Sequence, residues 1–70
     1  MKKFNITISY NNTDDVQEIM VNCNSSDQVV NFTNKNIIIG GYDLIIPIDE
    51  VSCIEVWSYD WDERYDVFEF

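Results

Sequence analysis

The side chains best suited to binding or chemistry are concentrated in the last fourteen residues of the chain, 57–70. This segment holds six of the ten aromatic residues, five carboxylates and a single base, Arg64. The residues that we expect to contact a partner are Trp57, Tyr59, Trp61, Tyr65, Asp60, Asp62, Glu63, Asp66 and Glu69. Tryptophan and tyrosine are enriched at interface hot spots, and carboxylates form charge-assisted hydrogen bonds with arginine and lysine. The acidic-aromatic segment therefore predicts a binding surface for a basic partner.

The same segment also has a purely structural interpretation. Trp57, Tyr59 and Trp61 alternate with polar residues, which is typical of a last strand with its aromatic side chains inward and its acids in solvent. The alternation stops after Trp61, so we expect a separate turn or short helix from Asp62 onward, and a chain without it should still fold. The two interpretations are compatible, because one face of a strand can be structural while the other binds.

Catalytic residue types are scarce throughout the chain. There is no histidine, and no serine or cysteine lies beside an evident base. Gly40-Gly41 lacks the lysine and hydroxyl residue of a phosphate-binding loop. The chain has paired carboxylates at Asp49-Glu50 and Asp62-Glu63, and two carboxylates can suffice for glycoside hydrolysis. A chain of 70 residues has little room for both a core and a substrate cleft, so we expect no enzymatic activity and no cofactor.

A metal site is not expected either. Asp60-Trp61-Asp62 matches the opening of a calcium-binding EF-hand loop. The sixth position of that loop requires glycine, and Tyr65 occupies it here. The glutamate needed at the twelfth position would lie beyond Phe70.

The charge of the chain restricts its partners. Thirteen acids and four bases give a net charge of −9, of which −8 lies in residues 43–70. Phosphate groups of nucleic acids and anionic lipids require lysine and arginine. The composition therefore excludes direct binding to nucleic acid or to such membranes and favours a basic protein surface.

Short strands with turn signals between them predict the fold. Residues 4–10 alternate between apolar and polar side chains, and a turn at 11–15 leads to a second strand, Val16–Cys23, so the two form an antiparallel hairpin. Further strands are expected at 29–32, 37–39, 42–46 and 52–56, with one helical turn at 48–51. The order of elements over 37–56 is similar to that of small SH3-like barrels and rolls. We predict one all-β, mainly antiparallel domain over residues 1–70, a small SH3-like barrel or roll of five to six strands with at most one short helical turn.

The side chains predicted to fill the core are apolar and lie on one face of each strand. They are Phe4, Ile6, Ile8, Val21, Phe32, Ile38, Leu44, Ile46, Ile54 and Val56. Cys23 and Cys53 are expected to face the interior as small hydrophobic residues. The first residues run directly into a strand pattern and resemble no signal peptide, so a cytoplasmic location with reduced thiols is expected. No apolar run approaches the length of a membrane span.

Three hypotheses for function follow from these observations. In size, charge and composition the chain is similar to phage-encoded anti-restriction and anti-CRISPR proteins that mimic DNA, and to immunity proteins that cover a nuclease toxin. This resemblance implies an inhibitor that blocks a basic, nucleic-acid-binding protein surface. The second hypothesis is an assembly module that docks through its aromatic C-terminal segment. The third is a protein that sequesters a nucleotide signal, for example within a homodimer, with only Lys2, Lys3, Lys35 and Arg64 available for the phosphates.

Overall fold

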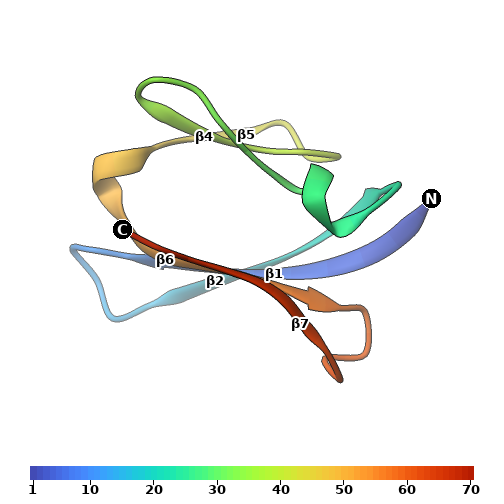
Figure 1. The fold of residues 1–70 in the computed structure, drawn as a ribbon. Helices are drawn as coiled ribbons and strands as arrows, with labels where there is room; N and C mark the ends of the chain where they lie inside the picture. Colours follow the sequence, from blue (N-terminus) through green and yellow to red (C-terminus); the bar gives the residue numbers. More distant parts are fainter.

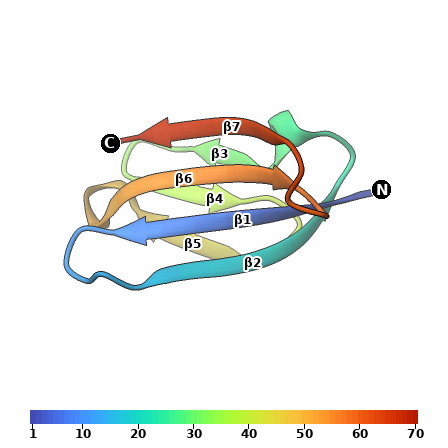
Figure 2. The same ribbon diagram turned by 90° about the horizontal axis from the view of Figure 1, so that it is seen from below.

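The chain folds into two antiparallel β-sheets that pack face to face, in a computed structural model that describes residues 1–70 (Figure 1). The strands are β1 (Lys2–Tyr10), β2 (Val16–Cys23), β3 (Val30–Phe32), β4 (Asn36–Ile39), β5 (Leu44–Pro47), β6 (Val51–Ser58) and β7 (Arg64–Glu69). One sheet has the order β2-β1-β6-β7 and the other the order β3-β4-β5, which lies behind the first in Figure 2. The predicted all-β, antiparallel class is confirmed.

The two sheets stay separate, so of the predicted alternatives, a barrel or a roll, the barrel does not close. No strand of one sheet forms a ladder with a strand of the other. Seven strands are present rather than five or six, and two 3₁₀ turns rather than one, η1 (Ser26–Gln28) and η2 (Ile48–Glu50). Neither turn, nor any other helix, is long and apolar enough to cross a membrane.

The extra strand is β7, in the region where a turn or short helix was expected. Trp57 lies opposite Arg64 and Val56 lies opposite Asp66, so Tyr65 is one residue more than the ladder needs. This β-bulge shifts the alternation of side chains by one position. The interrupted pattern after Trp61 therefore marks a turn and a bulged edge strand, not a change of secondary structure.

The first hairpin agrees with the sequence prediction. β1 ends at Tyr10 and β2 begins at Val16, and Ile6 lies opposite Ile19. Strict alternation determines this register, because a slip by one residue would turn the apolar side chains to solvent.

The core fills the space between the sheets. Seven of the ten predicted core residues are buried, whereas Ile38 and Leu44 are half-buried and Phe32 is exposed. The side chains of Ile37 and Ile39 face the core and that of Ile38 faces away from it. The sequence-based prediction had placed Ile38 in the core. Three consecutive isoleucines carry no alternation, so the sequence could not indicate which of them point inward. Further buried side chains are Ile19, Cys23, Val29, Val30 and Val51.

The Gly40-Gly41 turn connects β4 to β5 and packs closely against β2 of the other sheet. The backbone N–H of Gly40 donates to the carbonyl of Val29 at 2.7 Å. A Cβ atom on Gly40 would lie 2.4 Å from the carbonyl oxygen of Gln28, and one on Gly41 would lie 2.3 Å from that of Asn22. Gly41 also has a φ of +75°, so both positions require glycine.

The two cysteines lie on opposite faces of the four-stranded sheet. Cys23 is buried on the inner face opposite Lys2, as expected. Cys53 lies opposite Ser9 on the outer face and is half-buried, so the prediction that it faces the interior is wrong. The two positions are seven residues apart along β1, or ~23 Å at ~3.3 Å per residue, which no disulfide spans.

Candidate functional site

Trp57 lies on the outer face of the four-stranded sheet, the face turned away from β3-β4-β5. In β6 the side chains of Ile54 and Val56 are buried, and those of Glu55 and Trp57 point the other way. The expectation that the aromatic residues of this strand point into the core is therefore wrong. The isoleucines of both sheets fill the core, so the indole ring of Trp57 lies on the surface.

Trp57 is held there by a charged network. The guanidinium carbon of Arg64 lies 5.8 Å from the ring centroid of Trp57, and Nη1 of Arg64 donates to Oε2 of Glu55 at 2.9 Å. Oε1 of Glu55 also accepts from the hydroxyl of Thr7 at 3.2 Å and from Nε1 of Trp57 at 3.5 Å. Arg64, the single base of the acidic-aromatic segment, is thus neutralised within the protein.

Trp61 projects from the turn between β6 and β7. Its ring centroid lies 5.9 Å from that of Trp57, and the side chain is exposed. Its φ of 65° is the only positive value at a non-glycine residue. A bulky residue in this conformation is a genuine outlier, and strain of this kind is concentrated at functional sites. The left-handed backbone also explains why the predicted strand does not continue to Trp61.

Asp60 holds the turn together. Its Oδ1 accepts from the hydroxyl of Ser58 at 2.7 Å and from the backbone N–H of Asp62 at 3.2 Å. These hydrogen bonds, that of Ser58 first, lower the pKa of the Asp60 carboxyl below its ordinary value. The same hydroxyl of Ser58 accepts from the backbone N–H of Glu63 at 3.0 Å. Asp60 therefore has a structural role, while the side chains of Asp62 and Glu63 are exposed.

The two tyrosines of the predicted site differ in role. Tyr59 is exposed, with Nζ of Lys3 5.4 Å from its ring centroid, and Nδ2 of Asn5 donates to its carbonyl at 2.6 Å. Tyr65, the bulged residue, packs edge-on against the buried ring of Phe4 at 5.7 Å. Tyr59 thus belongs to the turn, and Tyr65 supports the core.

The remaining two acids lie on opposite faces of β7. Asp66 is opposite Val56 on the inner face, and Glu69 is opposite Cys53 on the outer face at the far end of the strand. The structure therefore brings together one subset of the predicted residues, which we call the acidic-aromatic turn. It consists of Trp57, Tyr59, Asp60, Trp61, Asp62 and Glu63.

Apolar side chains missing from the sequence-based prediction extend this surface. Met20 is opposite Asn5, which is opposite Trp57, so the three form one row across the sheet. Met20 is 49% exposed, and Val16 and Val67 are also exposed on the outer face. The signal in the sequence was Met20, an apolar residue that lies between the buried positions Ile19 and Val21 and therefore points to the opposite face of the strand.

A second group of acids also escaped prediction, at the other end of the sheet. Asp14 and Asp15 lie in the β1–β2 loop, and Asp49 and Glu50 in η2. Asn11 joins the two segments, because its backbone N–H donates to the carbonyl of Glu50 at 2.9 Å and its side chain to that of Asp49 at 2.8 Å. These acids are about 35 residues apart in sequence, so only the fold brings them to one end.

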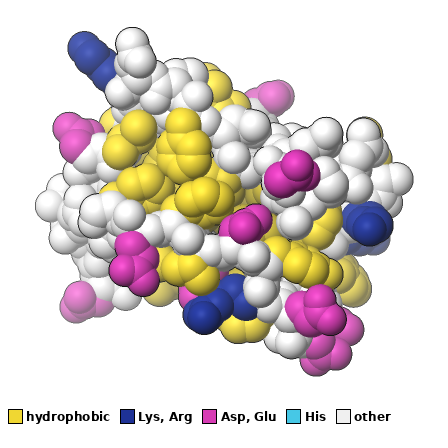
Figure 3. All heavy atoms as spheres, in the orientation of Figure 1, with side chains coloured by type: hydrophobic (Ala, Val, Ile, Leu, Met, Phe, Trp, Pro, Cys, Tyr) yellow, Lys and Arg dark blue, Asp and Glu magenta, His cyan; other side chains and the backbone are white.

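The carboxylates are almost entirely without basic partners in the protein. Of the thirteen acids only Glu55 forms a salt bridge, to Arg64. Figure 3 shows Asp and Glu side chains spread over the visible face, with few bases between them. The surface is therefore acidic at both ends of the four-stranded sheet.

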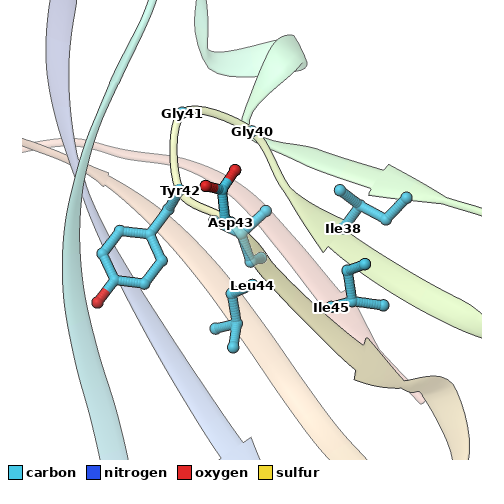
Figure 4. Close-up of a pocket in the computed structure, with 8 residues that line it drawn as sticks. Ile38, Gly40, Gly41, Tyr42, Asp43, Leu44 and Ile45 are labelled. Carbon is cyan, nitrogen blue, oxygen red and sulfur yellow. The ribbon is translucent and has the colours of Figure 1, made fainter.

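The surface has two hollows, and each is lined by a single carboxylate. The first follows the β4–β5 hairpin from Ile38 to Ile45 (Figure 4), and its only ionisable carboxylate is that of Asp43. The second lies beside Lys35 and Asp49. No three His, Cys, Asp or Glu side chains come close enough together to hold a metal ion.

Comparisons of the chain with protein-family models, with curated proteins and with solved structures gave no match.

Proposed function

We propose that this protein is a non-enzymatic inhibitor that binds and blocks a basic, nucleic-acid-binding surface of another protein. The observation that carries the proposal is that twelve of the thirteen carboxylates form no salt bridge with a lysine or arginine of the protein. Ordinary surfaces intersperse both signs of charge. Here the bases that would complement the acids are missing from the chain, and a basic partner would supply them.

Self-repulsion supports the same proposal. The longest dimension of the molecule is 31 Å, several times the screening length of ~8 Å at physiological ionic strength. Repulsion therefore acts between neighbouring carboxylates, such as those of Asp62 and Glu63, and not between the two ends of the sheet, and this local repulsion opposes compaction. Lysine and arginine of a partner would relieve this repulsion, as phosphate-binding surfaces do for DNA.

The acidic-aromatic turn is the best-organised part of this surface. Ser58, Asp60 and Asn5 fix its backbone through the hydrogen bonds described above, so little conformational entropy is left to lose on binding. Asp62 and Glu63 would accept hydrogen bonds from arginine or lysine. The exposed ring of Trp61 would stack on a guanidinium group.

The proposed partners are nucleases and other nucleic-acid-binding proteins. DNA mimics such as anti-restriction and anti-CRISPR proteins, and immunity proteins against nuclease toxins, are the model for such an interaction. We expect it to take place in the cytoplasm, where the free thiols of Cys23 and Cys53 would stay reduced.

A second candidate function is an assembly module that docks mainly through apolar contacts. The exposed side chains of Val16, Met20, Trp61 and Val67 on one face of the sheet favour it. In that case the acids serve solubility, and the affinity for the partner would change little with salt.

The decisive experiment compares two variants with the same change of charge. Proteins from the cells that encode the chain are captured on the wild type, on Asp62→Asn/Glu63→Gln and on Asp14→Asn/Asp15→Asn. We expect the wild type and the second variant to retain a basic protein that duplex DNA releases, and the first variant to lose it. Retention by all three proteins at high salt would reject the inhibitor proposal in favour of apolar docking.

A further inference from the structure

The backbone of β7 has a free hydrogen-bonding edge. β7 is the last strand of the order β2-β1-β6-β7, so no strand lies beyond it. The N–H of Phe70 donates to the carbonyl of Ser52 at 3.0 Å, and antiparallel pairs alternate between hydrogen-bonded and non-hydrogen-bonded types. By this alternation Phe68 directs its N–H and C=O to β6. Val67 and Glu69 direct their N–H and C=O groups outward, where no strand of the protein pairs with them.

Beside this edge phenylalanine side chains from both sheets are exposed. The ring of Phe32 lies 5.5 Å from that of Phe68 and 6.0 Å from that of Phe70. Phe32 and Phe70 are 47% and 48% exposed although Phe68 packs against the core. Figure 3 shows hydrophobic side chains gathered on this side of the molecule, where the edges of β3 and β7 lie. The three phenylalanines thus form an apolar strip that the protein's own strands do not cover.

The opposite edge of the sheet differs. Along β2 the inward side chains Ile19, Val21 and Cys23 are all buried, so the sandwich is closed there. A strand added to β2 would gain backbone hydrogen bonds but would cover no apolar residue on the inner face. A strand added to β7 would gain backbone hydrogen bonds and would also cover the exposed side chains of Phe32 and Phe70.

We infer that β7 accepts an extended segment of the partner as a fifth strand of the sheet. This inference rests on the proposed function, because it identifies how the basic partner binds. Glu69 makes the outer face of this edge acidic, and the only base of β7, Arg64, is already paired with Glu55. The segment therefore carries lysine or arginine on its outer face, beside Glu69, and apolar side chains on its inner face, over Phe32 and Phe70.

A second copy of this chain fits the edge less well. Each copy has a net charge of −9, and pairing two β7 strands would bring their acids together. Charge complementarity thus selects a basic segment with alternating apolar residues. Strand addition of this type draws affinity from the main chain and specificity from alternate side chains.

The test uses a capped peptide of alternating lysine and valine with the six-residue length of β7, and a peptide of the same composition in block order. Amide hydrogen exchange is followed by NMR with and without each peptide. We expect the alternating peptide to slow exchange at Val67 and Glu69 by about tenfold or more, and the block peptide to leave it unchanged. The inference would be overturned by equal effects of both peptides or by protection along β2 instead of β7. It would also be overturned by protection that rises with the concentration of this protein in the absence of peptide, because the edge would then pair with a second copy of the chain.

Two variants make the test specific to the edge. Val67→Pro removes one outward N–H without breaking a bond to β6, and proline is tolerated at such edge positions. Glu69→Arg leaves the backbone intact and repels the lysine side chains. Both should abolish the protection, whereas Glu18→Arg on β2 should not. If the peptide fails while partner capture still depends on Asp62 and Glu63, strand addition is wrong and the proposed function stands.

Discussion

The guanidinium group of Arg64 lies over the ring of Trp57, 5.8 Å from its centroid, while the same side chain donates to Glu55. This contact pairs Arg64 with an acid of the protein itself, and Lys3, the other base beside the acidic-aromatic turn, lies against the ring of Tyr59. Asp62, Glu63 and the exposed ring of Trp61 are then the groups that the turn offers to a partner. Removing Arg64 should therefore affect partner binding less than removing either acid.

Trp61 is expected to matter for binding and not for folding. Its ring is exposed, and its positive φ costs about 1 kcal/mol that glycine would not incur. Trp61→Gly should leave the free energy of unfolding within ~1 kcal/mol of the wild type and weaken partner binding by about tenfold or more. Urea denaturation and calorimetry measure the two quantities. A clearly destabilised variant with normal affinity would show that the ring is structural.

The turn should respond to acid through Asp60. Its pKa is lowered in the folded protein, so its ionised form stabilises the fold above the ordinary pKa of 3.8, and this stabilisation is lost as the pH falls through the lower, folded value. Ser58→Ala removes the main cause, so the pKa of Asp60 should rise toward its ordinary value. Carboxyl-carbon NMR titration measures this. An unchanged pKa would mean that the hydrogen bond of Ser58 is not formed in solution.

Gly41 is expected to be essential to the packing of the two sheets. An alanine there would combine a φ of +75° with a Cβ atom 2.3 Å from the carbonyl oxygen of Asn22. Gly41→Ala should destabilise the fold by about 2 kcal/mol or more. Asp43→Ala, in the same turn but exposed, serves as the control and should change stability by less than ~0.5 kcal/mol. Thermal unfolding of the three proteins compares them directly.

Truncation tests the structural importance of β7. A chain that ends at Trp61 loses the strand that pairs with β6 and the partly buried ring of Phe68. We now expect this chain to lose its cooperative unfolding transition, in contrast to the expectation from the sequence pattern. Near-UV circular dichroism and calorimetry would detect the loss. A truncated chain that melts cooperatively near the wild-type temperature would show that β7 is dispensable.

The parts of the fold that depend on local alternation could be predicted from the sequence. The β1–β2 hairpin and its loop follow from the alternation of residues 4–10, the turn residues at 11–15 and the shared phase of Ile19, Val21 and Cys23. The phase of Ile37-Ile38-Ile39 could not be predicted, because a run of identical residues has no phase. Barrel closure could not be predicted either, because it depends on whether strands distant in sequence form hydrogen bonds, which the local pattern does not contain.

The candidate site was predictable only in composition. The segment 57–70 was identified correctly as rich in aromatic and acidic residues, but its side chains point to both faces of the sheet. The bulge at Tyr65 separates Asp66 from the acids of the turn, and a single extra residue has no signature in composition. The pairing of Arg64 with Glu55 likewise arises from the β6–β7 register.

Competition with duplex DNA tests the central claim most directly. A captured partner is labelled and bound to duplex DNA, and this protein is added at increasing concentration, with Asp62→Asn/Glu63→Gln and Asp14→Asn/Asp15→Asn as the matched pair. The claim predicts complete displacement of DNA by the wild type, weaker displacement by the first variant than by the second, and a steep loss of affinity as salt rises. A stable ternary complex of partner, DNA and this protein would contradict it.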